Sequence, residues 1–327
     1  MIPICSQMIQ AKGLKRAFGS FVAVRNVSFE IEPARGVVGL LGPNGAGKTT
    51  TMRLLTGYLR PDEGSVFISG IDASTEEGRL QIKHTIGYLP ENTPLYPEML
   101  VSEYLEFMGR IRGLDGPALQ KAGRRMLDEL ELGSHFYTPI GLLSRGFRQR
   151  VGLAGALIHD PSVIILDEPT GGLDPNQIEQ IRGLIRRLAA EKTVLLSTHI
   201  LQEVEDICER VIIIHGGEVV ADQPTGELKR SETIHAVLAL EGSDALSLQR
   251  ELQNVPGVDS ALLVQSTADG ASHATEDNPA FFTLEIQWQG APEDLLTSLV
   301  SRRFRIRSFS PGSRSLQEIF QELTHKV

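Results

Sequence analysis

The sequence predicts an α/β fold built around a parallel sheet, followed by a smaller α+β domain. Apolar runs of strand length alternate with amphipathic stretches of helical period over most of residues 36–224. That order is typical of a parallel sheet with helices on both faces. Between about residues 98 and 160 the period is helical throughout, which indicates a helical insertion. Beyond about residue 232 the strands and helices follow a different order.

The first half of the chain begins with three strands. Residues 10–18 and 21–31 have strand character, and residues 36–42 form a wholly apolar run that is typical of a buried strand. A helix then runs from Lys48 to Gly57, a residue type that commonly ends helices. The elements predicted up to residue 160 are a strand at 65–70, a helix at 76–84, a strand at 85–90, and helices at 101–113, 118–132 and 145–159.

The second half continues this alternation and then changes. The elements predicted up to residue 224 are a strand at 163–169, a helix at 177–191, a strand at 193–199, a helix at 200–210 and a hairpin at 210–223. Pro224 and Gly226 mark a boundary, and a connecting helix is expected to start within 226–230. The last predicted elements are a strand at 234–240, a helix at 244–255, a strand at 260–266, a loop at 267–280, a strand at 281–288, a helix at 292–302, a strand at 304–310 and a helix at 315–323.

Two domains are expected from this division. The larger covers residues 1–230 and contains the helical insertion at about 92–160, and the smaller covers residues 231–327. The β-α-β-β-α-β order of the smaller domain is that of the ferredoxin-like arrangement. Its role stays open between a packing or dimerisation module and a sensor of a small ligand.

Composition excludes several classes of protein. The 327 residues are 41% hydrophobic and 22% charged, as in ordinary globular proteins, and the net charge of −9 argues against a broad cationic face for nucleic acid. Neither Cys5 nor Cys208 has a CxxC neighbour, so neither a disulfide framework nor a zinc site is expected. No apolar run approaches the roughly 20 residues of a bilayer-spanning helix. The N-terminal segment carries its charges after its apolar part, the reverse of a signal peptide.

A glycine-rich loop joins the buried strand at 36–42 to the helix that begins at Lys48. Its sequence GPNGAGKT matches the pattern G-x-x-x-x-G-K-[ST] in the strand–loop–helix context that a phosphate-binding loop requires. Glycines let several backbone N–H groups turn toward one point, and the helix N-terminus adds partial positive charge. Lys48 is expected to contact the β- and γ-phosphates, and the Thr49 hydroxyl to bind Mg²⁺. The expected nucleotide-binding residues are Gly42, Pro43, Asn44, Gly45, Ala46, Gly47, Lys48, Thr49 and Thr50.

Two carboxylates end the apolar run that starts at Val163. Successive side chains of a strand point to opposite sides, so Asp167 and Glu168 are expected to differ in role. We assign Asp167 to Mg²⁺ and Glu168 to the attacking water, as general base or as the group that orients it. His199 follows another strand of the same sheet, and ligands bind at the carboxyl ends of parallel strands. His199 is therefore expected to contact the γ-phosphate.

Five motifs, taken together and in order, carry a family resemblance. GPNGAGKT, LSRGFRQR, VIILDEPT, GGLDP and STH resemble those of the ATP-binding cassette (ABC) ATPases. They are most similar to the ATP-binding subunits of ABC-2-type transporters, including the gliding-motility and multidrug-export type. The resemblance covers about residues 8–230 and extends more loosely to the C-terminal domain. It implies a P-loop NTPase fold, with a mixed sheet core, an antiparallel β subdomain and a helical insertion.

The resemblance assigns the segment LSRGF to the family signature LSGGQ. Arg145 and Phe147 replace a glycine and the glutamine, while Ser144 and Gly146 are retained. In this family the signature caps the γ-phosphate that is bound on the other subunit. A helix that begins at Ser144 also suits an anion on physical grounds, because its first N–H groups are free and its dipole end is positive. The chain has one set of motifs, so it is expected to need a partner cassette.

Further positions take roles from the same resemblance. Asp174 matches the D-loop, which contacts the opposite subunit. Phe18 stands where the family places an aromatic ring under adenine, with Val22 and Val24 expected beside the base. Glu91 occupies the position of a glutamine that usually reaches Mg²⁺. A glutamate still offers a hard oxygen ligand but adds negative charge next to the phosphates.

These features predict the ATP-hydrolysing subunit of an ABC-2-type transporter, with export favoured. The expected cofactors are ATP and Mg²⁺. The expected partners are a second ABC subunit and a separate multi-span membrane permease, with no nucleic acid. A homodimer is favoured over a heterodimer, and the permease is expected to dock near residues 92–105, where Leu95, Tyr96, Pro97 and Met99 form a small apolar set. The expected location is the cytoplasmic face of the cell membrane.

Two other functions stay open at this point. One is a soluble ABC ATPase that acts on ribosomes or DNA, against which stand the single cassette and the lack of a heptad run or cysteine ligands. The other is a nucleotide sensor that does not hydrolyse ATP. The intact set of Lys48, Asp167, Glu168 and His199 argues against a sensor.

Overall fold

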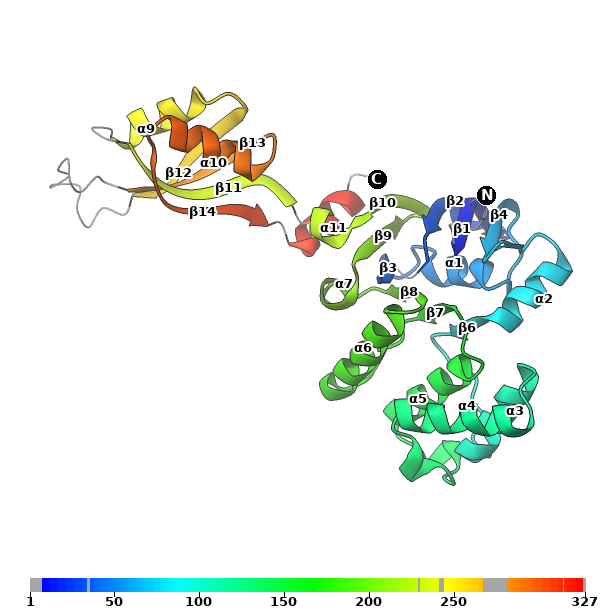
Figure 1. The fold of residues 1–327 in the computed structure, drawn as a ribbon. Coiled ribbons are helices and arrows are strands. Elements are labelled where there is room, and N and C mark those ends of the chain that lie inside the picture. Colours follow the sequence, from blue (N-terminus) through cyan, green and yellow to red (C-terminus); the bar gives the residue numbers. More distant parts are fainter. Residues whose placement is uncertain are drawn as a thin grey trace, which may run out of the picture. The chain divides into compact units, whose positions relative to one another are not determined.

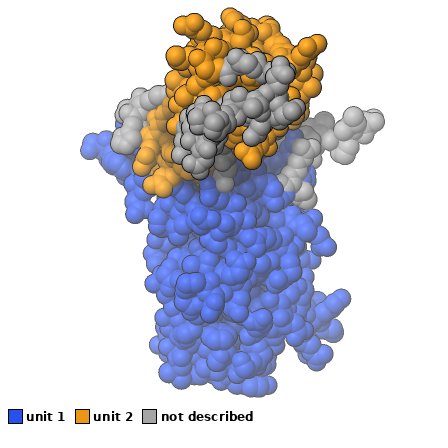
Figure 2. All heavy atoms as spheres, turned by 90° about the vertical axis from the view of Figure 1, so that its left-hand side faces the viewer, with its two compact units in different colours: residues 1–225, 323–327 blue, residues 226–322 orange. Residues whose placement is uncertain are grey.

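The computed structural model describes residues 8–33, 36–228, 230–240, 244–266, 281–313 and 315–325. Cys5 and the loop expected at 267–280 lie outside the described residues. The chain divides into two compact units (Figure 2): unit 1 is residues 1–225 with 323–327, and unit 2 is residues 226–322. The division between Thr225 and Gly226 lies between Pro224 and Gly226, the residues that mark the boundary in the sequence, and a few residues before the expected domain limit at residue 230.

Unit 1 is built on a mixed sheet of ten strands in the order β5-β4-β1-β2-β10-β9-β3-β8-β7-β6. Its elements, in chain order, are β1 (Ile9–Phe18), β2 (Phe21–Ile31), β3 (Val37–Leu41), α1 (Lys48–Leu55), β4 (Glu63–Ile68), β5 (Ile71–Asp72), α2 (Glu76–Thr85), β6 (Ile86–Leu89), α3 (Val101–Ile111), α4 (Gly116–Glu129), the 3-10 helices η1 (Gly133–His135) and η2 (Ile140–Leu142), α5 (Arg145–Leu157), β7 (Val163–Asp167), α6 (Pro175–Ala189), β8 (Thr193–Thr198), α7 (Leu201–Ile207), β9 (Arg210–His215) and β10 (Glu218–Pro224).

The central strands β6, β7, β8, β3 and β9 are parallel. Every residue of β3, β7 and β8 is buried, as expected for strands with helices on both faces. In register, Leu41 pairs with Thr198 and Asp167 pairs with Ser197, so these strands end at the same edge. The residues that follow β3, β7 and β8 therefore meet there.

The strands β1, β2, β4 and β5 form an antiparallel part of the same sheet. It joins the parallel part through one residue pair between β2 and β10, Asn26 with Glu218. The mixed sheet core with an antiparallel region confirms the predicted fold class. The predicted helical insertion is also present, since α3, α4 and α5 gather at one end of unit 1 (Figure 1). In α5, every residue from Val151 to Leu157 is buried.

Unit 2 has a four-stranded antiparallel sheet in the order β12-β13-β11-β14, which is the predicted ferredoxin-like arrangement. Along β13 the side chains alternate between buried and half-buried, and α9 and α10 contribute Leu248, Leu252, Leu295 and Leu299 to the core on one face. The remaining elements of the chain are α8 (Thr225–Leu228), β11 (Arg230–Ala239), α9 (Ala245–Gln253), β12 (Val258–Ser266), β13 (Phe282–Trp288), α10 (Pro292–Ser301), β14 (Arg305–Ser313) and α11 (Leu316–His325).

The strand β11 begins earlier than the sequence predicts. The expected connecting helix is present as α8, which starts at Thr225, one residue before the 226–230 range, and ends at Leu228, whereas β11 begins at Arg230 instead of residue 234. Arg230 pairs with Ser313 of β14, so strand pairing extends the strand beyond its apolar core. Such pairing between distant segments overrides local propensity.

None of the described helices has both the length and the apolar character needed to cross a bilayer.

His159 follows α5 and is largely enclosed. Burial, reinforced by the positive charge of Arg112, lowers the pKa of His159 from 6.5 to about 4. Because the folded pKa lies below the unfolded value, the unfolded chain takes up the proton first as the pH falls. The contribution of neutral His159 to stability is therefore complete above pH 6.5 and is lost as the pH falls toward 4.

We predict that His159→Gln flattens the dependence of the melting temperature on pH between 7 and 5. Between pH 7 and pH 5 the wild type should lose roughly 1 kcal/mol of stability that the variant keeps, after allowance for the partial exposure of His159. Thermal unfolding of both proteins at a series of pH values measures it. His84→Gln, which removes an exposed histidine of α2, is the matched control. Parallel pH curves for the wild type and His159→Gln would contradict the prediction.

Candidate active site

The loop between β3 and α1 adopts a backbone that requires glycine. Gly45 and Gly47 have φ angles of 81° and 104°, in the left-handed region. A Cβ atom at Gly47 would lie 2.5 Å from the carbonyl oxygen of Ala23, so a larger residue does not fit. Gly47 is the N-cap of α1, and no side chain caps the helix. The first N–H groups of α1 therefore suit an anionic ligand.

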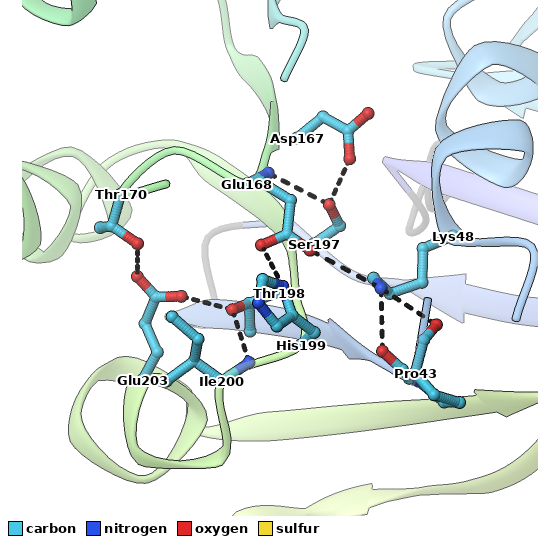
Figure 3. A network of polar contacts seen from close by, with 11 residues as sticks. Pro43, Lys48, Asp167, Glu168, Thr170, Ser197, Thr198, His199, Ile200 and Glu203 are labelled. Carbon is cyan, nitrogen blue, oxygen red and sulfur yellow. Dashed lines mark hydrogen bonds and ion pairs between the residues drawn. The ribbon is translucent and has the colours of Figure 1, made fainter. Parts of the chain in front are cut away.

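Lys48 lies between the loop and the end of β7. Its side chain is almost fully buried, and its Nζ donates hydrogen bonds to the carbonyl oxygens of Gly42 at 2.8 Å and Pro43 at 3.3 Å. The same Nζ lies 3.6 Å from Oε1 of Glu168, so the two form an ion pair (Figure 3). A phosphate bound in the loop would compete with these oxygens for the ammonium group.

Asp167 is fully buried at the end of β7. Its Oδ1 accepts a hydrogen bond from Ser197 Oγ, while its Oδ2 has no hydrogen-bond partner among the described residues. Burial raises the pKa of Asp167 above its usual range and the charge of Glu91 adds to the rise, whereas the hydrogen bond from Ser197, the nearby hydroxyl of Thr49 and the charge of Lys48 act against it. A buried carboxylate oxygen without a donor, beside a threonine hydroxyl, suits a hard cation.

Glu168 is held at both its backbone and its carboxylate. Its N–H donates to the carbonyl oxygen of Ser197 at 3.1 Å and to Ser197 Oγ at 3.2 Å. Its Oε2 lies 2.9 Å from Nδ1 of His199 (Figure 3). The φ angle of Glu168 is 50°, a left-handed conformation that is uncommon for residues other than glycine and that concentrates at functional sites. The turn therefore directs this carboxylate between Lys48 and His199.

Lys48, Glu168 and His199 border one open cavity of about 440 Å³, a volume typical of small-ligand sites. Most of the predicted site residues line it, whereas Gly42, Ala46 and Asp167 are buried and do not. The lining residues are Phe21, Ala23, Pro43, Asn44, Gly45, Gly47, Lys48, Thr49, Thr50, Glu91, Asn92, Arg145, Glu168, Gly171 and His199.

The residues of β1 and β2 that line the cavity differ from those expected beside the adenine base. Phe18 is half-exposed under the guanidinium of Arg16, 5.0 Å from its ring centroid, and Phe18 is not among the lining residues. Phe21 and Ala23 line the cavity instead, and Val24 is fully buried in the core. The expectation for Val24 is therefore wrong, because alternate residues of β2 face opposite sides and the alternation does not reveal which side the ligand takes. Adenine stacking on Phe18 stays a prediction.

Ser144 and Gly146 of the signature, and the D-loop residue Asp174, do not line the cavity of their own chain. Ser144 caps α5 and accepts a hydrogen bond from the N–H of Phe147 at 3.4 Å. Asp174 caps α6 and accepts from the N–H of Gln177 at 3.0 Å. Gly146 packs against Gln177, since a Cβ atom there would lie 2.5 Å from the amide carbon. The two helix starts therefore pack against each other.

Arg145 is a lining residue that the sequence reasoning treated only as a replacement for glycine. Its guanidinium packs on Gly172, where a Cβ atom would lie 2.2 Å from Arg145 Cζ. The first turn of α5 contains no acidic residue, so no carboxylate of the same turn balances this cation at the positive end of the helix dipole. An unbalanced cation of this kind is the sequence signal that would have indicated a cavity for anions. Asn92 was missed because nothing distinguishes it from its neighbours.

Comparison with known proteins places the chain among its relatives. A family model described as ABC transporter matches residues 24–171. The chain is 32% identical to the uncharacterized ABC transporter ATP-binding protein YxlF of Bacillus subtilis (strain 168), over 97% of this chain and 100% of that protein. It is 31% identical to the daunorubicin/doxorubicin resistance ATP-binding protein DrrA of Streptomyces peucetius, over 98% of this chain and 93% of that protein.

A solved structure of an ABC cassette is also similar to this chain. The dimeric structure of a post-hydrolysis state of the ATP-binding cassette MJ0796, bound to ADP and Pi, matches with a TM-score of 0.61 and 27% identity. The match covers 66% of this chain and 98% of that chain. The loop, the strand-end carboxylates and the relatives lead to one conclusion: this chain belongs to the family of ABC transporter ATP-binding proteins.

Proposed function

We propose that this chain binds ATP with Mg²⁺ and hydrolyses the ATP to ADP and phosphate. The observation that carries the proposal is that Lys48, Glu168 and His199 border one cavity at the carboxyl edge of the parallel strands. This edge is where ligands bind in open α/β sheets. The matched cassette with bound ADP and Pi is consistent with the same reaction.

The residues fit a magnesium ion bound together with a nucleotide. The described residues contain no group of three or more His, Cys, Asp or Glu side chains arranged for a metal, which is usual where Mg²⁺ relies on phosphate oxygens and water. Thr49 and the free Oδ2 of Asp167 would hold the ion, with Glu91 beside them. Bound there, Mg²⁺ would neutralise charge on the phosphates.

The chain's own groups divide the remaining work. Lys48 would exchange the carbonyl oxygens of Gly42 and Pro43 for phosphate oxygens. Glu168 would orient a water molecule and accept its proton, since its carboxylate is nearly buried and held by His199. His199 is about half-exposed and can contact the γ-phosphate as well as Glu168. Catalysis of phosphoryl transfer depends on this kind of positioning and charge stabilisation.

The proposed reaction needs two subunits. Ser144 and Asp174 are exposed at helix starts and lie outside the cavity of their own chain, which supports their action on nucleotide held by a partner. The matched MJ0796 cassette is dimeric. We propose a second copy of this chain as the partner, closing over two ATP molecules so that Ser144 and Gly146 of each chain cap the γ-phosphate on the other.

Transport is the proposed use of the hydrolysis energy. A groove of about 210 Å³ lies between the end of β6 and the helices α3 and α5, with Tyr58, Tyr88, Tyr96, Tyr104 and Phe107 among its lining residues. We propose that a multi-span membrane permease docks in this groove at the cytoplasmic face of the cell membrane. Export is favoured because DrrA is named for drug resistance.

The division of labour between the domains is part of the proposal. The larger domain, residues 1–230, carries the nucleotide site, and residues 92–160 supply most of the residues that line the groove. The smaller domain, residues 231–327, belongs to subunits of this kind, since both sequence relatives align over nearly the whole chain.

We predict that Glu168→Gln lowers turnover of ATP by at least about 100-fold, because the amide cannot accept a proton from water. The affinity for ATP should stay within about threefold of the wild type, since Lys48 and the loop are unchanged. Phosphate release and equilibrium binding of ATP measure the two effects. Glu77→Gln, an exposed glutamate of α2, is the control. Turnover in Glu168→Gln equal to the wild type would remove this residue from the reaction.

We predict that Tyr96→Ala weakens association with the membrane partner. The ring of Tyr96 is half-exposed and packs edge-on against Phe107, with 5.6 Å between ring centroids. Loss of a central aromatic side chain from an interface costs about 2 kcal/mol, or roughly 30-fold in affinity. The fraction of tagged chain that co-purifies with a multi-span protein from detergent-solubilised membranes measures this.

Tyr137→Ala is the matched control for the groove. Tyr137 lies in the same helical insertion and is more exposed than Tyr96, but it is not among the residues that line the groove. Neither substitution should change ATP hydrolysis by the isolated chain. Equal retention of Tyr96→Ala and wild type on the permease would contradict the proposed docking site.

A further inference from the structure

A buried carboxylate outside the proposed reaction lies next to the active site. Glu203, in the first turn of α7, is fully buried. Its Oε1 accepts a hydrogen bond from Thr170 Oγ1, and its Oε2 accepts one from Thr198 Oγ1 (Figure 3). Burying a carboxylate is costly unless hydrogen bonds stabilise it. One side chain thus joins the segment after β7 to the end of β8.

The two threonines stand beside the two groups that act on the γ-phosphate and the water. Thr198 directly precedes His199, and its Oγ1 also accepts a hydrogen bond from the N–H of Ile200 at 3.1 Å. The Thr198 hydroxyl therefore links Thr198 and Ile200, the two residues on either side of His199. Thr170 follows Glu168 by two residues and is itself buried. Its carbonyl oxygen accepts from the N–H of Leu173 at 3.2 Å, which holds the turn.

Together these contacts close a ring. It runs from Glu168 along the chain to Thr170, by hydrogen bonds through Glu203 to Thr198, along the chain to His199, and back to Glu168 across the 2.9 Å contact of Oε2 with Nδ1. The His199–Glu168 contact is the one link of the ring that is exposed to solvent, because His199 is half-exposed. The buried links set the distance that this exposed link must span.

We propose that Glu203 is a positioning residue that holds His199 against Glu168 for hydrolysis. The inference rests on the proposed function. Glu203, Thr170 and Thr198 are not among the residues that line the cavity, so their effect should reach the reaction through His199 and Glu168. Binding of ATP depends on Lys48 and its loop, which the ring does not include. Loss of Glu203 should therefore lower kcat and leave the affinity for ATP nearly unchanged.

A double-mutant cycle with His199 tests the proposal on the full chain. Glu203→Ala should lower kcat about tenfold or more while KM for ATP stays within about twofold. In a His199→Ala background the same substitution should lower kcat by less than about twofold, because the group that Glu203 positions is already absent. A merely structural role would lower kcat by the same factor in both backgrounds.

Conservative variants keep the test decisive if Glu203→Ala folds poorly. Glu203→Gln keeps an acceptor oxygen and gains an amide donor, so kcat should stay within about threefold of the wild type. Thr170→Val and Thr198→Val each remove one hydroxyl at nearly constant volume and should lower kcat several-fold. Thr193→Val, a buried threonine at the opposite end of β8, is the control and should keep wild-type kcat.

Two results would overturn the inference, and both differ from a failure of the proposed function. One is a wild-type kcat in Glu203→Ala, Thr170→Val and Thr198→Val. The other is a Glu203→Ala substitution that lowers kcat by the same factor in the wild type and in the His199→Ala background. Absence of ATP hydrolysis by the wild-type chain would instead overturn the proposed function and this inference together.

Discussion

The hydrogen bonds of Ser197 are the interaction on which the site depends. Its Oγ donates to Asp167 Oδ1 and accepts from the N–H of Glu168, and its carbonyl oxygen accepts from the same N–H. This geometry requires β7 and β8 to be parallel and in the register that pairs Asp167 with Ser197. A shift of one residue would turn each carboxylate toward the opposite face of the sheet. In the proposed reaction, strand register would therefore decide which carboxylate serves the metal and which serves the water.

Charge balance is the second constraint on the site. Asp167, Glu168 and Glu91 bring three carboxyl groups near the single ammonium group of Lys48, and burial raises the pKa of Asp167. Triphosphate would add more negative charge to the same cavity. Mg²⁺ and the N-terminus of α1 would balance part of that charge, and Arg145 adds a second cation at the border of the cavity. On the proposed function, the site would therefore favour a nucleotide that arrives together with its metal.

The sequence predicted those parts of the site that are encoded locally. The Gly45–Lys48 segment requires a left-handed backbone, which glycine alone adopts freely, so the motif specifies its own shape. Asp167 and His199 end strands whose apolar runs are visible in the sequence, and the edge where parallel strands end is a general property of the fold. The larger organisation, with a helical insertion and a smaller antiparallel domain, follows from a change of hydrophobic period.

The parts that escaped prediction depend on contacts between distant residues. Ser197 hydrogen-bonds to Asp167 and Glu203 hydrogen-bonds to Thr170, each about thirty positions away in the sequence, so neither contact is visible in the local segments, although Ser197 belongs to the STH motif. The choice of Ala23 over Val24 depends on which face of β2 meets the cavity, and alternation alone does not reveal it. The early start of β11 is decided by its partner β14.

The central claim is that the nucleotide site at the strand ends of one chain is completed by the signature residues of a second chain. The most direct measurement is a structure of the full-length Glu168→Gln variant with ATP and Mg²⁺. The account predicts a dimer in which each γ-phosphate contacts Lys48 of one chain and Ser144 of its partner, with the metal between Thr49 and Asp167. ATP bound by a single chain, with Ser144 of both chains remote from phosphate and Lys48 still bonded to Gly42, would contradict it.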